Sequence, residues 1–214
     1  MSTQALSRRN FLKVAGLTAA TATLTCAGLG YAATRAPALE TPELTLEEEN
    51  PMNKRILVTY ATRAGSTVEV AAAIAESLGS RGYAVDVKPV KEKPSLGGYS
   101  AVVMGSAIRM GAWLPEAVAF VKANQAALDG MPAALFTVHM LNTGDDEAGR
   151  TARLGYLNTV RPLLHGAEEV YFAGKFDFSR LSFLDRTIAK LVKAVESDSR
   201  DWAKIRGWLP AALA

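Results

Sequence analysis

Two short segments of this chain combine glycine with hydroxyl, cationic and bulky apolar side chains. The first consists of Thr62, Arg63, Ala64, Gly65, Ser66 and Thr67. Hydroxyls at both ends, a glycine in the turn and a following helix N-terminus form an anion site, because free N–H groups and the helix dipole attract a phosphate. The spacing is that of neither a dinucleotide fingerprint nor a Walker A loop. For this loop alone, an ordinary helix start capped by Ser or Thr is an equal alternative.

The second segment consists of Ser106, Ala107, Ile108, Arg109, Met110, Gly111 and Trp113. It joins glycine-containing backbone to a cation and to large apolar side chains. We expect Met110 and Trp113 to press on an aromatic ring while exposed N–H groups meet its polar edges. A role for Trp113 as a core residue at the start of a helix is the alternative.

Buried strands must position these loops, and the hydrophobic pattern predicts five of them. A nearly continuous apolar run occupies residues 55–61, and further strands are predicted at residues 84–87, 101–104, 133–138 and 169–173. Such runs are typical of parallel strands that are covered on both faces. The anion loop follows the first strand, and the second segment follows the third.

Helical patterns alternate with these strands. One helix is predicted from Val70, Ile74 and Leu78, and a second from Leu114, Val118 and Val121, with Pro115 in its first turn. A closing helix is predicted from Leu184, Ile188, Leu191 and Val195. The alternation predicts an α/β fold with a doubly wound parallel sheet, whose ligand crevice lies at the carboxyl ends of the strands.

The first 32 residues have the layout of an export signal. Arg8-Arg9, followed by Phe11-Leu12-Lys13, leads into a mildly apolar run that is short for a membrane span. The arginine pair predicts the twin-arginine (Tat) route, which exports folded proteins and suits a chain that carries a prosthetic group. We expect cleavage before Ala33, with lipidation at Cys26 as the less favoured alternative and retention as an anchor left open. Cys26 is the only cysteine. Cleavage before Ala33 would remove it and so exclude disulfides, thiolate catalysis and cysteine-bound metal in the mature chain.

Three regions are therefore expected: a signal peptide at 1–32, an acidic proline-containing linker at 33–52, and one domain at 53–214. The chain has 24 Lys and Arg against 21 Asp and Glu, a formal net charge of +3. Arg8, Arg9 and Lys13 account for the whole excess, because the first 32 residues contain no acid. The basic character of the whole chain is therefore no argument for a nucleic-acid partner.

Because of these two loops, the chain resembles flavodoxin-fold proteins, and more narrowly the menaquinone-dependent protoporphyrinogen oxidase branch of that family. The residues that carry the resemblance are 56–67, 104–111, Met131-Pro132 and Asp185-Arg186. The similarity extends over about residues 54–208.

The resemblance implies a flavodoxin-like five-stranded sheet in the order 2-1-3-4-5 and one non-covalent FMN, which carries the chemistry in place of catalytic side chains. Residues 62–67 would hold the 5′-phosphate, with Arg63 as a phosphate or ring-edge partner. Residues 106–113 would flank one side of the isoalloxazine, and Arg109 would favour the anionic reduced flavin. The other side would be lined by Val138, His139, Met140, Leu141 and Asn142. A protonated His139 would act as Arg109 does, but a loop histidine satisfied by its neighbours is the favoured alternative.

Two functions remain open at this point. The first is an FMN-dependent oxidoreductase that passes electrons to a quinone, in the periplasm or at the outer face of the cytoplasmic membrane. The alternative is a periplasmic flavodoxin-type carrier that acts between redox proteins, and an FMN-binding accessory or sensor module is a weaker third. Such carriers are typically strongly acidic, so the formally neutral mature chain favours the enzyme or a protein of the membrane surface. Apart from the Tat translocase during export, the expected partner is a quinone or a redox protein.

The sequence lacks the residue patterns of hydrolytic and metal sites. It offers no Ser/His/Asp or paired-carboxylate arrangement for hydrolysis, no metal set, and no role for His165.

Residues 142–166 form a long connection with Asp145-Asp146-Glu147 at its start, followed by Arg150, Arg153 and Arg161. In the oxidase branch an extended region here accompanies quinone-linked activity, so a docking place and a plain crossover are equal alternatives. Export counts against protoporphyrinogen itself as substrate, because that compound is made and consumed in the cytoplasm.

Overall fold

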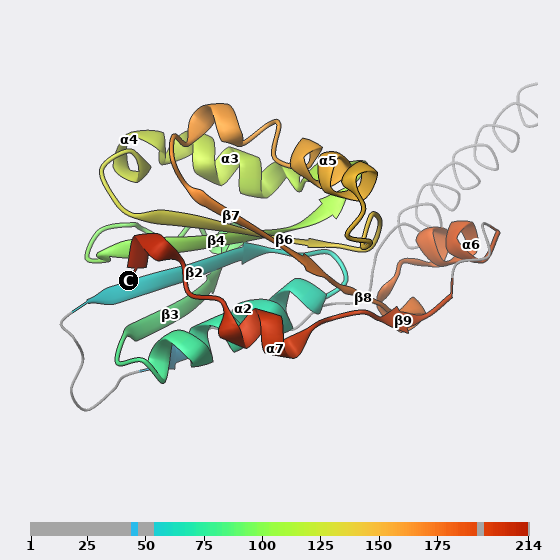
Figure 1. The fold of residues 1–214 in the computed structure, drawn as a ribbon, viewed down its shortest axis with the longest axis horizontal. Coiled ribbons are helices and arrows are strands. Elements are labelled where there is room, and N and C mark those ends of the chain that lie inside the picture. Colours follow the sequence, from blue (N-terminus) through green and yellow to red (C-terminus); the bar gives the residue numbers. More distant parts are fainter. Residues whose placement is uncertain (1–43, 47–53, 192–194, 214) are drawn as a thin grey trace, which may run out of the picture. The chain divides into compact units, whose positions relative to one another are not determined.

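The computed structural model describes residues 44–46, 54–191 and 195–213 (Figure 1). The expected export signal, including Cys26, and most of the expected linker lie outside these residues. Contacts divide the chain into two units, one comprising residues 38–180 and 195–214 and the other including residues 181–194. No helix in the described ranges is long and apolar enough to cross a membrane.

The larger unit is built on five parallel strands. They are β2 (Arg55–Ala61), β3 (Ala84–Pro89), β4 (Ala101–Arg109), β6 (Ala133–His139) and β7 (Glu168–Ala173). Their order is β3-β2-β4-β6-β7, and all four pairings are parallel. The α/β class and the predicted order 2-1-3-4-5 are confirmed.

An additional edge strand, β1 (Leu44–Leu46), pairs antiparallel with β3. The Thr45 hydroxyl donates to Asp86 Oδ1 at 2.9 Å, and Arg55 and Tyr99 donate to the same carboxylate. Burial alone would raise the pKa of Asp86, but these hydrogen bonds outweigh it and lower the pKa to about 2. Part of the predicted linker is therefore a strand of the sheet, because a charged network fixes it to β3.

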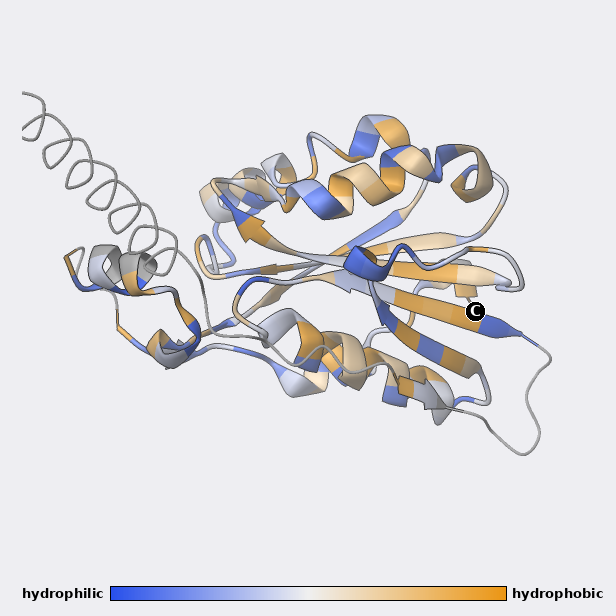
Figure 2. Ribbon diagram, turned by 180° about the vertical axis from the view of Figure 1, so that it is seen from behind, coloured by the Kyte–Doolittle hydropathy of each residue, from blue (hydrophilic) through white to orange (hydrophobic). Residues whose placement is uncertain are grey.

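Helices cover both faces of the sheet (Figure 1). On one face lie α2 (Ser66–Gly79) and α7 (Trp202–Gly207); on the other lie α3 (Pro115–Ala123), α4 (Gln125–Leu128) and α5 (Glu147–Gly155). Figure 2 shows the apolar strands between these layers. Alternate residues of β2 serve the two cores: Ile56, Val58 and Tyr60 pack with α2, whereas Leu57 packs with α3.

Several short elements complete the fold. The two-residue strand β5 (Ala112–Trp113) pairs with the end of β4, and β8 (Lys175–Phe176) pairs with β9 (Ser197–Asp198) in a separate two-stranded sheet. Short 3-10 helices occupy Val90–Glu92, Arg161–Leu163, Phe178–Arg180 and Ala211–Leu213. The predicted helices around Val70 and Val118 are confirmed as α2 and α3, with Pro115 as the first residue of α3.

The predicted closing helix is present over Leu184, Ile188 and Leu191 but does not include Val195, and another helix follows it. The helix α6 (Phe183–Leu191) belongs to the second unit, and Val195 lies outside it with 76% of its surface exposed. A strand follows at Ser197–Asp198, and Asp201 then caps α7 by accepting a hydrogen bond from the Lys204 N–H. The core of the larger unit is closed by Ile205 of α7, which is fully buried.

Candidate functional site

The register of the sheet brings the predicted loops to one edge. Ala61 of β2 lies opposite Ser106 of β4, Ala107 lies opposite Val138 of β6, and His139 lies opposite Ala173 of β7. Since the strands are parallel, the segments that follow them leave the sheet on the same side. The structure therefore places the 62–67, 106–113 and 138–143 segments along one edge of the sheet, as the sequence predicts.

The loop from Thr62 to Thr67 has the backbone of an anion site. Gly65 has a left-handed φ of 85° and is the N-cap of α2, while its N–H donates to Thr62 Oγ1 at 3.0 Å. The Thr67 hydroxyl, in the first turn, is fully buried and has no hydrogen-bond partner in the described part of the chain. An unpaired buried hydroxyl costs stability, so its presence at a helix N-terminus fits a site completed by an external acceptor such as a phosphate.

The Arg63 side chain is exposed and reaches the first turn of α3. Its Nη2 donates to Glu116 Oε2 at 2.9 Å, and the second guanidinium nitrogen contacts the other carboxylate oxygen. Glu116 stands in the first turn of α3. The Arg63 side chain is therefore engaged in joining two segments of the site, rather than directed at a phosphate.

The segment after β4 is a tight hairpin with an apolar tip. Ile108 pairs with Trp113 and Arg109 with Ala112, which leaves Met110 and Gly111 as the turn. Both have a positive φ, 53° and 76°, as two-residue hairpin turns require. Met110 is 99% exposed although its backbone conformation disfavours a side chain with a Cβ. An exposed, strained methionine is the feature of this hairpin best suited to contacting a flat apolar ligand.

Ser106 and Trp113, at the base of the hairpin, have buried side chains. The Ser106 hydroxyl accepts from the Leu114 N–H at 3.0 Å and donates to the Ala107 carbonyl at 2.8 Å. Trp113 is 3% exposed and lies among core residues. Its side chain offers almost no surface to a ligand, so the core alternative is what the structure shows. Ala107 and Ile108 are half-buried between base and tip.

The segment after β6 changes from buried to exposed along its length. Val138 and His139 are buried, Met140 is half-buried, and Leu141 is 74% exposed. Asn142 follows in a left-handed conformation with φ 59°. Leu141 and Met110 thus present large exposed apolar side chains from two segments at the same edge of the sheet.

His139 is satisfied by its own loop. Its Nδ1 lies 2.7 Å from the Leu141 carbonyl oxygen, which only accepts, so Nδ1 carries the proton. Burial lowers the pKa of His139, and the hydrogen bond to Leu141 offsets this only in part. The ring is therefore neutral near pH 7, which agrees with the favoured alternative and not with a cationic role.

The arginines of the 142–166 connection bind groups within it or on the adjacent strand β7. Arg153 Nη1 donates to the Gly144 carbonyl at 2.6 Å and also contacts the Asn142 carbonyl, and Arg150 contacts the Asp145 carbonyl. Arg161 makes two 2.8 Å hydrogen bonds to Glu169. Asp146 caps α5 through the Gly149 N–H, as its position suggests. These side chains brace the loop, so the structure supports the crossover alternative more than a row of docking cations.

Tyr156, at the end of α5, is a support that the sequence interpretation missed. Its hydroxyl donates to the Leu141 carbonyl at 3.1 Å and accepts from Asn142 Nδ2 at 2.8 Å. Its ring lies 5.7 Å from the His139 ring. No local motif marks this role, because it depends on the way α5 returns to the loop.

The chain that leaves β7 also reaches the site. A Cβ on Gly174 would lie 2.9 Å from Val138 Cγ1, 3.2 Å from Met140 Sδ and 3.4 Å from Ser66 Oγ. The Gly174 N–H donates to the His139 carbonyl at 2.8 Å. The glycine after the fifth strand was the available signal, since such a residue permits a close backbone approach. Within the described residues, no group of three or more His, Cys, Asp or Glu is arranged to hold a metal ion.

Comparison with known proteins agrees with this architecture. A family model described as "Flavodoxin domain" matches residues 57–202. Two curated relatives are named protoporphyrinogen IX dehydrogenase (quinone). The Escherichia coli (strain K12) protein is 28% identical over 167 residues, covering 71% of this chain and 90% of the relative. The Leishmania major protein is 29% identical over 169 residues, covering 71% of each. Among solved structures, a flavodoxin from the domain Archaea aligns with a TM-score of 0.43 and 17% identity, over 64% of this chain and 99% of that one.

Proposed function

The chain belongs to the flavodoxin domain family, and from this premise we propose that it is an FMN-dependent oxidoreductase that passes electrons to a quinone. The single observation that carries the cofactor is the buried, unpartnered Thr67 hydroxyl beside the left-handed Gly65 at the start of α2. The printed names of the two relatives support a quinone as the acceptor class. Bound FMN supplies hydride and electron transfer that none of the protein side chains provides.

The phosphate end of the site is formed by backbone and hydroxyl groups. The Thr67 hydroxyl and the N–H groups at the start of α2 would bind the 5′-phosphate, and Thr62 holds Gly65 in its left-handed conformation through a 3.0 Å hydrogen bond. Helix dipole and hydrogen bonds then act on the same anion. Arg63 closes the crevice edge through Glu116 instead of adding a charge to the phosphate.

The ring end of the site is apolar. Met110 and Leu141 would flank the isoalloxazine and exclude water from it, and both side chains are exposed for that purpose. Neutral His139 fixes the loop that carries Leu141. Arg109, which follows Ile108 in the hairpin, remains the proposed cation for the anionic reduced flavin.

We also propose export through the Tat route, with the folded domain in the periplasm or at the outer face of the membrane. The support is the Arg8-Arg9 pair with its flanking Ser7 and Phe11. Export of a folded protein suits a cofactor that is inserted in the cytoplasm, and it favours a donor other than protoporphyrinogen. Replacing both arginines with lysine in a reporter fusion should abolish Tat-dependent export; unchanged export would contradict this part of the proposal.

The decisive experiment reduces the FMN-loaded protein without oxygen and follows its reoxidation. A menaquinone analogue should reoxidise it much faster than flavodoxin-partner redox proteins do. The reverse order would favour the carrier. A colourless protein that does not bind added FMN would end the proposal altogether.

A further inference from the structure

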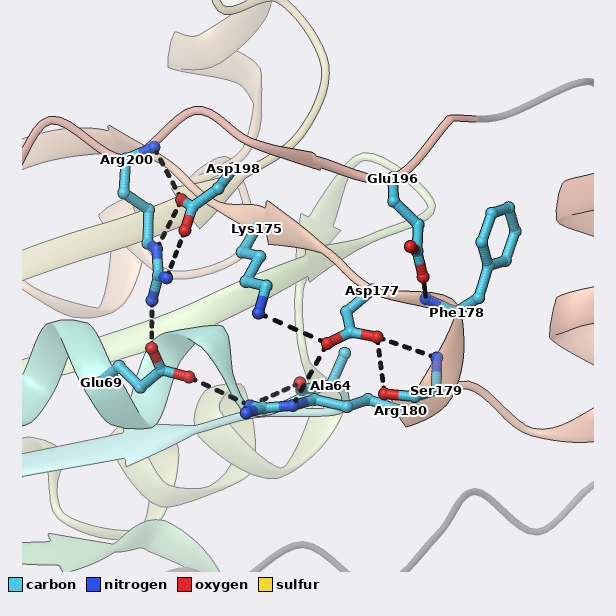
Figure 3. Close-up of polar contacts among 10 residues, drawn as sticks. All are labelled: Ala64, Glu69, Lys175, Asp177, Phe178, Ser179, Arg180, Glu196, Asp198 and Arg200. Carbon is cyan, nitrogen blue, oxygen red and sulfur yellow. Dashed lines mark hydrogen bonds and ion pairs between the residues drawn. The ribbon is translucent and has the colours of Figure 1, made fainter.

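Two arginines from the chain after β7 converge on one carboxylate beside the phosphate loop (Figure 3). Glu69 lies in the first turn of α2, three residues after Ser66. Arg180 Nη1 donates to Glu69 Oε1 at 3.1 Å, and Arg200 Nη1 contacts Glu69 Oε2. The three residues, which we name the Glu69 clamp, join segments more than 100 positions apart in sequence.

Arg180 also touches the phosphate loop itself. Its Nη1 lies 3.5 Å from the Ala64 carbonyl oxygen, one residue before Gly65. The backbone at Gly174 approaches the same loop, because its Cβ position is 3.4 Å from Ser66 Oγ. The segment that carries Arg180 therefore adjoins the phosphate end of the site at two independent points.

Both arginines are held in place by further carboxylates. Arg200 forms a two-pronged pair with Asp198, including a 2.8 Å bond from Nε, and Arg180 Nε lies 3.8 Å from Asp177 Oδ2. Asp177 in turn lies 3.4 Å from Lys175 Nζ. The Arg200 side chain is only 6% exposed, so its charge is poorly screened by water.

Glu69 poses an electrostatic problem for a phosphate. A carboxylate in the first turn of a helix is favoured by the dipole, but it repels a phosphate dianion that binds the same helix start. Burial would raise the pKa of Glu69, yet the hydrogen bonds and charges of Arg200 and Arg180 outweigh it and lower the pKa. Glu69 is thus ionised near neutral pH, and the two guanidinium groups beside it offset its negative charge.

We propose that Arg180 and Arg200 are positioning residues of the phosphate site: they neutralise Glu69 and fasten the β8–β9 sheet to the phosphate loop, so that the protein prefers flavin that carries a phosphate. This inference rests on the proposed function, because it assigns residues to the phosphate end of the FMN site. It means that charges remote in sequence from the phosphate loop set the preference for FMN over riboflavin.

The test compares the dissociation constants of FMN and riboflavin by flavin fluorescence titration of the flavin-free protein. Arg180→Ala and Arg200→Ala should each weaken FMN about tenfold and leave riboflavin within about twofold, because only FMN meets the uncovered Glu69 charge. Arg180→Lys should restore part of the FMN affinity, since it restores the charge. Added salt should reduce the loss, since it screens the repulsion.

Glu69→Gln separates this mechanism from direct contact between arginine and phosphate. In that background Arg180→Ala should have little effect on FMN, because the Glu69 charge is gone and Asp177 keeps its pair with Lys175. Arg161→Ala is the matched control: Arg161 pairs with Glu169, which lies at the opposite end of the sheet, opposite Leu135 near the start of β6. It should leave the ratio of the two affinities unchanged.

The outcomes are distinguishable. Equal losses for FMN and riboflavin in Arg180→Ala and Arg200→Ala would overturn the inference in favour of a merely structural role. A full tenfold loss that persists in Glu69→Gln would overturn the mechanism in favour of direct phosphate contact. Should one alanine variant fail to fold by circular dichroism, the other alanine variant and Arg180→Lys decide the question. Wild-type protein that binds neither flavin would refute the proposed function instead.

Discussion

The indole Nε1 of Trp113 donates a 2.9 Å hydrogen bond to the hydroxyl of Thr137, and both side chains are buried. Trp113 lies in β5, at the base of the hairpin that presents Met110, whereas Thr137 lies in β6 next to the loop that presents Leu141. The bond joins the supports of the two exposed apolar side chains. A tryptophan that the sequence places near a ligand is therefore anchored behind the site.

Thr137→Val should leave the Trp113 indole without its buried acceptor. We expect the free energy of unfolding to fall by about 1–3 kcal/mol, the cost of an unpaired buried polar group. Urea unfolding of the flavin-free protein measures this. Thr137→Ser keeps the hydroxyl and should lose less, so equal stability of the wild type and Thr137→Val would contradict the assignment.

Thr67→Ala should separate stability from cofactor binding. The hydroxyl has no hydrogen-bond partner in the described part of the chain. Its loss should therefore leave the free energy of unfolding of the flavin-free protein unchanged or slightly higher. FMN affinity should fall about tenfold, because a charge-assisted hydrogen bond is lost. Thr67→Ser should preserve binding, and His165→Ala, at an exposed position, should alter neither property. A Thr67→Ala protein that binds FMN normally would show that the phosphate loop is misassigned.

Met110→Asn should weaken FMN binding and raise the free energy of unfolding. Asn-Gly is the preferred pair for a two-residue turn with both φ angles positive, so we expect a gain of about 0.5–1 kcal/mol in the free energy of unfolding. The apolar side chain is lost at the same time, which should weaken FMN severalfold. Met110→Leu keeps an apolar flank and serves as the control. Thermal unfolding and FMN titration of the same samples measure the two effects. A Met110→Asn protein whose stability and FMN affinity both rise, or both fall, would contradict the prediction.

Asp86→Asn should remove a pH dependence of stability. The folded pKa of Asp86 is about 2, below its ordinary value of 3.8. A depressed pKa means that the carboxylate stabilises the fold fully above about pH 4 and that this contribution, about 2 kcal/mol, is lost as the pH falls toward 2. The variant should be less stable at pH 7 and less sensitive between pH 4 and 2. Parallel stability curves for the two proteins, measured by urea unfolding, would argue against the network.

Local patterns were enough to predict the sheet and the segments at its edge. The β2 run from Ile56 to Ala61 is apolar except for Thr59 because both faces of the strand are covered, and such a run is visible without the fold. Gly65 between Thr62 and Ser66 likewise indicates a turn into a helix wherever it occurs. Each of these predictions depends on neighbours within a few residues.

The remaining features depend on partners far apart in sequence. Whether Trp113 faces a ligand or the core is decided by Thr137, 24 residues away. The role of Arg200 is decided by Glu69, and that of Tyr156 by the carbonyl of Leu141. The closing helix was predicted to run too far because an apolar period up to Val195 does not reveal that Ser197 pairs with Phe176. Long-range pairing of this kind leaves no periodic trace in the sequence.

The antiparallel direction of β1 determines the edge of the sheet at which this strand begins. Leu44 lies opposite Val87, toward the carboxyl end of β3, while Leu46 lies opposite Val85 nearer its start. The first residue of β1 therefore lies toward the same edge of the sheet as the carboxyl ends of β2, β4 and β6, from which the loops of the site leave. Anything attached to the chain at Leu44 would therefore lie nearer the loops of the site than the opposite end of the sheet.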